Sequence, residues 1–322
     1  MHNGSLVVGV DAGGTSTRVA VYSLRGTRVG YGRAGGGNPS AHGLTAAATE
    51  VGTALKAALD GLDPSLVAAS VAGVAGNNPA FGQELKRVWA AHGVPARPRM
   101  INDVPVAYAA GTPEPSGTVL LAGTGAAAAR VTGHELDSIA DGLGWLLADE
   151  GSGFWIGRAA AKAVVRALDR AGDSDRPVEG TLVESVVGHF LGDERGPTPR
   201  REAERIVRLA QADRMTLAPL SALVSQAAAE GDPMATEIVG RAARHLTESV
   251  ARVYQGGPIV LAGSVLTSEG PVRQAVTEIL RERWAATVTT ARDGAGAASW
   301  LAALPLLSTR ESTDLHQAFT EP

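Results

Sequence analysis

Apolar and polar residues alternate in short blocks along the first third of the chain. Residues 5–12 form an apolar run interrupted only by Asp11, residues 17–23 alternate, and residues 27–33 form a third block, which together predict three strands separated by tight turns. A helical pattern that closes at Gly61 follows, and then an apolar strand, a helix, and a short strand leading into another helix. The order β-β-β-α-β-α-β-α predicts an α/β domain.

A similar three-strand opening starts again at residue 117, in GTVLLAGTGAAAARVTGHELDSIADG. The likeness is structural, because no sequence repeat of fixed period is present. Helices are then expected over residues 153–170, 178–191, 200–212, 216–230, 232–255 and 269–284, with a late strand in GPIVLAGSVLTS and a closing strand and helix within 287–307. The pattern predicts two similar units that face each other across a cleft, each with a glycine turn at the end of its first strand.

Composition excludes several classes of function. The 322 residues carry a net charge of −4 and contain no basic run with interleaved aromatic residues, which argues against a nucleic-acid partner. Cysteine is absent, which excludes disulfides, thiolate zinc sites, iron–sulfur clusters and cysteine nucleophiles. There is no apolar run long enough to span a membrane and no signal peptide, so we expect a soluble cytoplasmic protein.

Glycine turns are the first candidate chemistry. In VDAGGTST, Gly13 and Gly14 let backbone N–H groups approach an anion closely, and Thr15 adds a hydroxyl donor. Neutral donors of this kind suit polyphosphate oxygens whose charge is balanced by a metal, and Asp11 is the candidate to hold Mg²⁺, through water. The alternative is that each turn is only a tight hairpin. The functional interpretation is favoured because the turns recur, at Thr124 and Gly125 in AGTGA and at Gly263 and Ser264 in LAGS.

Carboxylates at strand ends are the second candidate chemistry. Asp103 stands where a strand gives way to a helix, so it is either the N-cap of that helix or a general base aimed into a cleft. Asp149 and Glu150 follow an apolar run and precede Gly-Ser-Gly; the charge preference of a helix N-terminus explains one of them, but not the glycines on both sides. Trp145 is either a core residue or a platform for a sugar ring.

The segments GVDAGGTST, INDVPVAYAAG, LAGTGAAA, DGLGWLLADEGSGFWIG and VLAGSVL together resemble the ATPase superfamily of sugar kinases, actin and Hsp70. Within it the chain is similar to the BadF/BadG/BcrA/BcrD-type group that includes eukaryotic-type N-acetylglucosamine kinases. The resemblance implies an α/β fold of two RNase-H-like (actin-like ATPase) domains with a central interdomain cleft. It places the first domain at 1–112, rejoined by the helix 294–308, and the second at 113–293; the polar tail 309–322 is expected to be disordered.

The same resemblance assigns roles to residues. Asp11 orients Mg²⁺, Gly13, Gly14 and Thr15 hold the β- and γ-phosphates of ATP, and Asp103 activates the sugar 6-hydroxyl. The remaining cofactor-binding residues would be Thr124, Gly125, Gly263, Ser264 and, on a nearby helix, Ser225. The remaining sugar-binding residues would be Asn38, Gly76, Asn77, Gly144, Trp145 and Asp149.

The function implied is that of an ATP-dependent kinase for the 6-hydroxyl of an amino sugar. N-acetylglucosamine is the first expectation, glucosamine or N-acetylmuramate the next, and a non-catalytic sugar- or nucleotide-binding regulator the alternative of another class. Leu143 and Ala148 replace residues usual in such kinases, which leaves the sugar less defined than the nucleotide. Family analogy implies a homodimer. Dehydratase activators and ROK-type kinases are disfavoured because both rely on cysteines.

Overall fold

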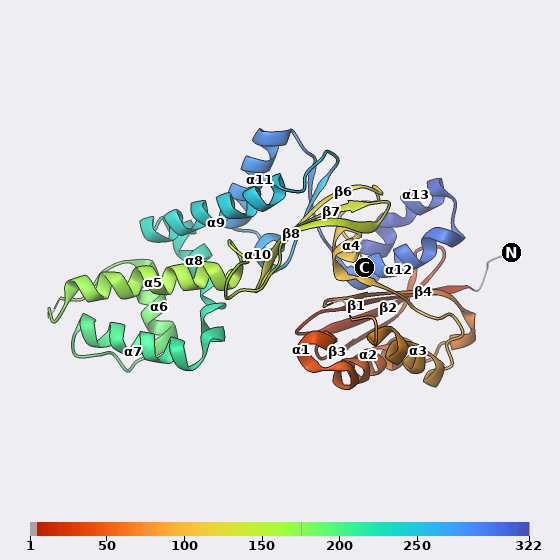
Figure 1. Cartoon of the computed structure of the whole chain (residues 1–322), viewed down its shortest axis with the longest axis horizontal. Coiled ribbons are helices and arrows are strands. Elements are labelled where there is room, and N and C mark those ends of the chain that lie inside the picture. The colour runs from red at the N-terminus through yellow and green to blue at the C-terminus, as the bar shows by residue number, and fades with distance from the viewer. Residues whose placement is uncertain (1–4, 77, 175, 322) are drawn as a thin grey trace. The chain divides into compact units, whose positions relative to one another are not determined.

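The computed structural model describes residues 5–76, 78–174 and 176–321, and it divides the chain into two compact units. Unit 1 contains residues 1–119, 131–137 and 289–322, and unit 2 contains residues 120–130 and 138–288. Figure 1 shows their elements along the chain. Each unit is described by itself below.

Unit 1 is built on a five-stranded sheet of order β3-β2-β1-β4-β5. β1 pairs with β2 antiparallel and with β4 parallel, and β4 pairs with β5 parallel. The three-strand opening predicted from the alternating pattern is therefore an antiparallel meander joined to a parallel half. The strands are β1 (Leu6–Ala12), β2 (Thr17–Ser23), β3 (Arg28–Ala34), β4 (Val67–Val74) and β5 (Arg99–Asn102).

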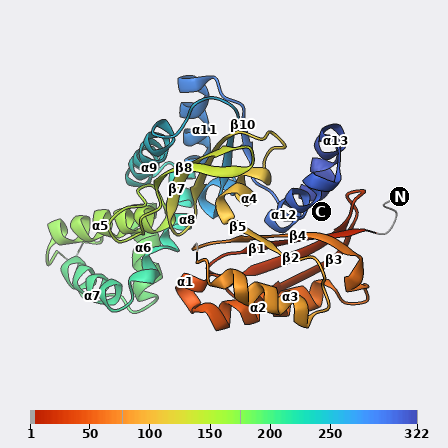
Figure 2. The ribbon, with the colours of Figure 1, turned by 45° about the vertical axis from the view of Figure 1, so that its right-hand side comes forward.

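Helices cover both faces of this sheet (Figures 1 and 2), and β1 is therefore buried on both sides. Alternate residues of β1 pack against different clusters: Val8 and Val10 belong to the cluster with α2 and α3, and Val7 to the cluster with α4 and α12. The helices are α1 (Pro39–His42), α2 (Leu44–Ala58), η1 (Pro64–Leu66), α3 (Phe81–Ala91), α4 (Asp103–Ala109), α12 (Gly294–Ala303), η3 (Leu304–Leu306) and α13 (Thr309–Thr320).

The closing helix α12 lies directly on β1. A Cβ placed on Gly9 would come within 2.1 Å of the Ser299 backbone nitrogen, so only glycine permits this contact. The Ser299 hydroxyl donates a hydrogen bond to the Ala20 carbonyl of the neighbouring strand. The segment near the end of the chain is thus part of the first sheet's packing.

The expectation of a disordered tail at 309–322 is wrong for the described residues 309–321. Residues 309–320 form α13, whose start is fixed by a capping box between Ser308 and Glu311. Phe319 is fully buried and stacks on Tyr22 with ring centroids 4.7 Å apart. The polar composition of the segment reflects a helix with one buried face.

Unit 2 combines most of a second sheet with a helical layer. The sheet has the order β10-β9-β6-β7-β8, and its residues 117–119, 131–132, 135–137 and 289–290 are counted with unit 1. The strands are β6 (Gly117–Ala122), β7 (Ala126–Thr132), β8 (Glu135–Asp141), β9 (Ile259–Ala262) and β10 (Val288–Thr290). The helices are α5 (Gly153–Ala171), α6 (Thr181–Leu191), α7 (Pro199–Ala212), η2 (Arg214–Leu217), α8 (Leu220–Ala229), α9 (Pro233–Ala251), α10 (Ser264–Thr267) and α11 (Pro271–Trp284).

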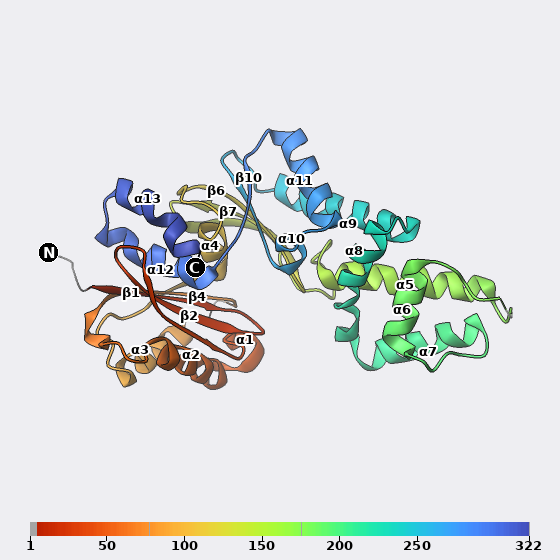
Figure 3. The ribbon, with the colours of Figure 1, turned by 180° about the vertical axis from the view of Figure 1, so that it is seen from behind.

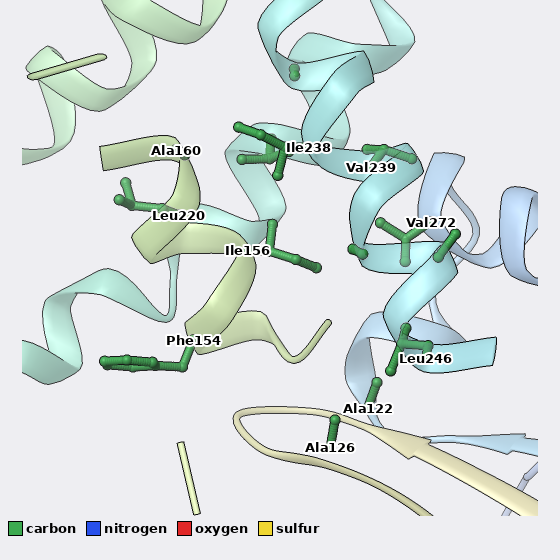
Figure 4. Packing of buried hydrophobic residues seen from close by; sticks show 14 of the residues in the cluster. Ala122, Ala126, Phe154, Ile156, Ala160, Leu220, Ile238, Val239, Leu246 and Val272 are labelled. Carbon is green, nitrogen blue, oxygen red and sulfur yellow. The ribbon is translucent and has the colours of Figure 1, made fainter. Parts of the chain in front are cut away.

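One hydrophobic cluster joins the helices of unit 2 to its sheet. Ile156 of α5, Leu220 of α8 and Leu246 of α9 belong to one buried cluster with Ala122 and Ala126 of the sheet, and Figure 4 shows Leu246 close to Ala122. Figure 3 gives the helical layer from behind. The expected α/β class with two domains is confirmed. No helix in residues 5–76, 78–174 and 176–321 is both long and apolar enough to cross a membrane.

Candidate functional site

The parallel strands of unit 1 bring three predicted site segments to one edge of the sheet. Ala12 lies opposite Val74, and Val74 opposite Asn102, so the carboxyl ends of β1, β4 and β5 are level. Residues that leave such ends gather at one place, where ligands bind in open α/β sheets. Asp11, Gly76 and Asp103 are therefore neighbours at this edge.

The Gly-Gly-Thr turn after β1 is held in shape by backbone contacts. The Gly13 N–H donates to the Ser16 carbonyl at 3.0 Å, and the Gly37 N–H donates to the Gly13 carbonyl at 3.0 Å. The ring of His42 lies 2.7 Å from the Gly14 carbonyl oxygen. Thr15 at its tip is exposed.

The fold itself does not explain glycine at the centre of this turn. A Cβ on Gly14 would meet nothing within 4 Å, and a Cβ on Gly13 would meet only the Ser16 carbonyl oxygen at 3.6 Å. Neither glycine has a φ in the left-handed region that favours glycine. The missing side chains therefore leave open space over the backbone, which is what the close approach of an anion requires.

Asp11 is a partly buried carboxylate beside this turn. Burial raises its pKa to about 6, and the neighbouring charge of Asp103 adds to the rise, while Arg18, at 3.8 Å, opposes it. Gly294, the first residue of α12, packs so closely that a Cβ there would lie 2.7 Å from an Asp11 carboxylate oxygen. Glycine at position 294 is therefore what leaves room for the carboxylate.

The surroundings of Asp11 fit a magnesium ion that is shared with a substrate. Within the described ranges, no group of three or more His, Cys, Asp or Glu side chains is arranged to hold a metal. Mg²⁺ keeps several waters and takes one or two carboxylates together with phosphate oxygens, so a single carboxylate suffices. A cation would also stabilise the charged form of Asp11 that burial disfavours.

Asp103 is not the N-cap of α4, which was one of the two roles that the sequence allowed for it. The N-cap of α4 is Asn102, whose side-chain oxygen accepts a hydrogen bond from the Val104 N–H at 2.9 Å. Burial raises the pKa of Asp103, while backbone N–H groups at the helix start oppose the rise. A carboxylate with raised proton affinity at a sheet edge is suited to accept a proton.

Asn38 and Gly76 lie together at the same end of unit 1. Asn38 caps α1, accepting from the Ser40 N–H at 2.8 Å, and a Cβ on Gly76 would lie 2.7 Å from the same Asn38 side-chain oxygen. Gly76 also has a φ of 75°, which favours glycine. The predicted Asn77 lies outside the described residues.

The second glycine turn, in unit 2, is anchored to the start of α5. The Gly153 N–H donates to the Gly123 carbonyl at 2.7 Å, and the Phe154 N–H lies 3.4 Å from the Thr124 carbonyl. Thr124 is exposed. Packing within unit 2 requires glycine at position 125, because a Cβ there would be 2.4 Å from an Asp149 carboxylate oxygen.

Asp149 connects two loops of unit 2. It is 5% exposed, has a φ of 58°, and accepts a hydrogen bond from the Gly144 N–H at 3.0 Å. Its own N–H donates to the Asp141 side chain at 2.8 Å. Burial raises its pKa, and backbone N–H groups, first that of Gly144, oppose the rise. These contacts show a structural role, and sugar binding by Asp149 stays a prediction.

The loop before Asp149 exposes apolar side chains. Leu143 and Leu147 are 84% and 92% exposed. Trp145 instead packs against the core of unit 2, with its ring centroid 4.4 Å from that of Phe154. Gly144, between them, has a φ of 102°.

A pocket in unit 2 contains two of the residues predicted to border the nucleotide. Ser225 of α8 and Ser264 of α10 line a cavity of about 460 Å³, together with Ser221, Gln226 and Ser268. Gly263 has a φ of 83°, and its Cα lies so close to β6 that a Cβ would meet the Ala122 carbonyl oxygen at 2.4 Å. A Cβ on Gly123 would be 4.0 Å from the Ser264 nitrogen, so the pocket adjoins the second glycine turn.

Three residues of the site escaped the sequence analysis. His42 and Gly294 contact the first turn and Asp11, and Asp141 orients Asp149. The φ of 65° at Asp141 gives no sequence signal beyond its place before Gly142. For Gly294, the glycine-rich stretch GAGAAS was the available signal.

Two α/β units, each with a glycine turn after its first strand and one with two carboxylates at a parallel sheet edge, define the phosphate-binding fold class of the actin-like ATPases. Residues 8–300 match the model of the BadF/BadG/BcrA/BcrD ATPase family, which agrees with this fold class. The chain belongs to this family, and the family implies the use of ATP.

One curated relative is an amino-sugar kinase by name. The chain is 28% identical over 176 residues to an N-acetylmuramic acid/N-acetylglucosamine kinase of Clostridium acetobutylicum, a match that covers 54% of this chain and 53% of the relative. The chain thus spans about half the length of that curated relative.

Solved structures share the fold. A candidate N-acetylglucosamine kinase of Chromobacterium violaceum has a TM-score of 0.70 at 23% identity, covering 92% of this chain and 98% of that one. Another candidate N-acetylglucosamine kinase, of Porphyromonas gingivalis, has a TM-score of 0.61 at 18% identity, covering 98% of both chains.

Proposed function

We propose that the protein is an ATP-dependent kinase that phosphorylates the 6-hydroxyl of an amino sugar, with N-acetylglucosamine as the first candidate substrate and glucosamine and N-acetylmuramate as alternatives. The observation that carries the proposal is the open space over Gly13 and Gly14, next to the carboxylates Asp11 and Asp103. Open backbone amides can take phosphate oxygens, and a nearby carboxylate with raised pKa can take the proton of an alcohol.

In the proposed reaction each residue of unit 1 has a separate task. The Gly14 N–H and the Thr15 hydroxyl hold the β- and γ-phosphates, and Gly13, whose N–H is used within the turn, leaves space for them. Asp103 accepts the proton of the sugar hydroxyl while the new oxygen–phosphorus bond forms and the bond from the γ-phosphorus to ADP breaks. Mg²⁺, when bound, neutralises charge on the phosphate oxygens, and Asp11 would hold it through water.

Residues of unit 2 are proposed to bind the rest of the nucleotide. The cavity beside Ser225 and Ser264 has about 460 Å³, within the range of pockets for small ligands. The exposed Thr124 offers a hydroxyl next to that cavity, which suits a phosphate. The 460 Å³ and the serine lining support an adenosine site.

The amino-sugar class rests on the name of the Clostridium acetobutylicum relative and on Asn38. Asn38 and Gly76 lie together at the sheet edge, where an amide could recognise polar groups of a sugar. A homodimer stays a prediction from family analogy.

A substrate panel tests the proposal directly. ADP release is measured with ATP and Mg²⁺ in the presence of N-acetylglucosamine, glucosamine, N-acetylmuramate and glucose. We expect at least one amino sugar to raise turnover well above the sugar-free rate. If no sugar does so while ATP still binds, the protein is a binding module and the kinase proposal fails.

Asp103→Asn tests the catalytic role within the same assay. Loss of a general base lowers kcat by about 10²- to 10⁴-fold, whereas ATP affinity should change little because the base contacts the sugar. Asn102→Ala, which removes only the helix cap, is the matched control. An Asp103→Asn enzyme with unchanged kcat would remove Asp103 from the mechanism.

A further inference from the structure

Cationic side chains form a stripe along the outer face of α5. Arg158, Lys162, Arg166 and Arg170 follow each other at intervals of four residues, and all four are exposed. Residues four apart lie on the same face of a helix, so these charges are neighbours about 6 Å apart along the axis. We call these four residues the α5 stripe.

In the part of the chain that the structure describes, no ion pair joins any member of the stripe to an acidic side chain. The acidic residue nearest to it in sequence, Asp169, pairs with Arg200 of α7 instead. Like charges at this spacing destabilise a helix, so the fold gains nothing from the arrangement.

The stripe forms one wall of a cavity of about 520 Å³ between α5 and α9. From α9, Arg241 adds a fifth cation, and its guanidinium lies 5.3 Å from the ring centroid of Trp155. Glu237 is the acidic residue in the lining. Five cations against one carboxylate give the cavity a strongly positive potential, in a chain whose net charge is −4.

We propose that this cavity is a second ligand site, which binds a small anion with several phosphoryl groups. A single phosphate can touch at most two members of the stripe, whereas a di- or triphosphate can reach more of them. The volume matches pockets for small ligands. A nucleic-acid strand would need aromatic platforms along its path, and Trp155 is the aromatic residue in this lining.

The site is separate from the proposed nucleotide pocket. The cavity of Ser225 and Ser264 shares no lining residue with that of the α5 stripe. The inference therefore does not depend on the kinase proposal, and its test measures binding alone.

The test is calorimetric titration of the full-length protein with inorganic tripolyphosphate at low salt. Arg166→Glu should weaken binding to this site by about tenfold or more, because a repelling charge replaces an attracting one in the middle of the stripe. Lys162→Glu, one turn away, should repeat the loss. The matched control is Arg208→Glu, an exposed arginine on α7 with the same change in net charge.

Tripolyphosphate can also reach the first glycine turn, so Gly14→Ala is titrated in parallel. Binding that persists in Gly14→Ala and disappears in Arg166→Glu is the expected result. Equal binding by the wild-type protein, Arg166→Glu and Arg208→Glu, or equal weakening in both variants, would overturn the site. A short oligothymidylate that binds more tightly than tripolyphosphate, and loses binding in Arg166→Glu, would overturn the assignment to a small anion.

Discussion

Glycines at different positions of this chain serve different purposes. Gly9 is glycine because α12 packs on it, and Gly125 because the Asp149 carboxylate does. Gly14 has no such neighbour, and its φ is not in the left-handed region. A substitution at Gly14 can therefore separate ligand binding from folding.

Gly14→Ala should leave stability within about 0.5 kcal/mol of wild type, as expected for an exposed site with free space. The KM for ATP should rise by about tenfold or more, since the added methyl group occupies the space of a phosphate. Urea unfolding and ADP-release kinetics measure the two effects. Gly9→Ala is the opposite case and should lose several kcal/mol, because its Cβ meets backbone at 2.1 Å. An unchanged KM in Gly14→Ala would mean that the turn does not hold the nucleotide.

Asp11→Asn should make the ligand-free protein more stable at neutral pH. The folded pKa of Asp11, about 6, is above its ordinary value of 3.8, so the folded state binds the proton more tightly than the unfolded state. Stability of the wild type therefore falls as pH rises from about 4 to 6, by roughly 2 to 3 kcal/mol at full effect. The variant lacks this loss.

Denaturant unfolding of both proteins, in a chelator and without nucleotide, checks this at pH 7.5 and at pH 4. Most of the advantage of Asp11→Asn should vanish at the lower pH, where Asp11 is protonated in the folded state and partly protonated in the unfolded state. Equal stability of the two proteins at pH 7.5 would show that burial does not raise the pKa of Asp11 in the folded protein. In a separate assay with ATP and Mg²⁺ at pH 7.5, the variant should lose the proposed kinase activity.

Among the elements, helix α5 has two features of functional interest, its first turn and its outer face. Its first turn donates to the carbonyls of Gly123 and Thr124, and its outer face carries the α5 stripe. The sequence predicted this helix at 153–170, and it spans Gly153–Ala171. The members of the stripe are never adjacent in sequence, so the stripe does not form a basic run.

Arg166→Glu should raise the melting temperature slightly at low salt. The substitution replaces two like-charge contacts, with Lys162 and Arg170, by two favourable ones, and the four changes together are worth about 1 to 2 kcal/mol. Added salt should remove the difference, because exposed charges are screened. A melting temperature that falls would show that the stripe is stabilised within the protein.

Regular elements were predictable where their pattern is local, and missed where it is not. β1, β2 and α9 follow from runs and periodicity within their own residues. α13 was missed because its polar sequence becomes helical by burying Phe319 against Tyr22, a contact almost three hundred residues apart in sequence. Likewise, motifs predicted Asp11 and Gly14, but the contact of Gly294 with Asp11 depends on how α12 packs.

At the scale of the whole molecule, unit 1 is assembled from both ends of the described chain. Trp300 of α12 is buried and donates to the Ser312 carbonyl of α13, and the Tyr22 hydroxyl donates to the Phe319 carbonyl. The first sheet therefore depends on residues that follow the whole of unit 2.

Phe319→Ala should destabilise unit 1 by about 3 to 5 kcal/mol, since it removes a fully buried aromatic ring. Hydrogen exchange should accelerate in β1 and β2 and stay unchanged in α5 and α8, which belong to unit 2. Gln317→Ala, at an exposed position of the same helix, is the control. Equal acceleration in α8 would mean that the two units unfold as one.

The two-ended construction of unit 1 also sets an order of events during synthesis. When the ribosome has released residues 1–119, the partners of β1 in α12 are still some 170 residues away, as the span from Val119 to Thr289 shows. At 5–20 residues per second the gap lasts on the order of ten seconds or more. During that time one face of the nascent first sheet has α4 but lacks α12 and α13, so apolar residues such as Val7 and Ala20 are incompletely covered, and surface of this kind is what chaperones bind.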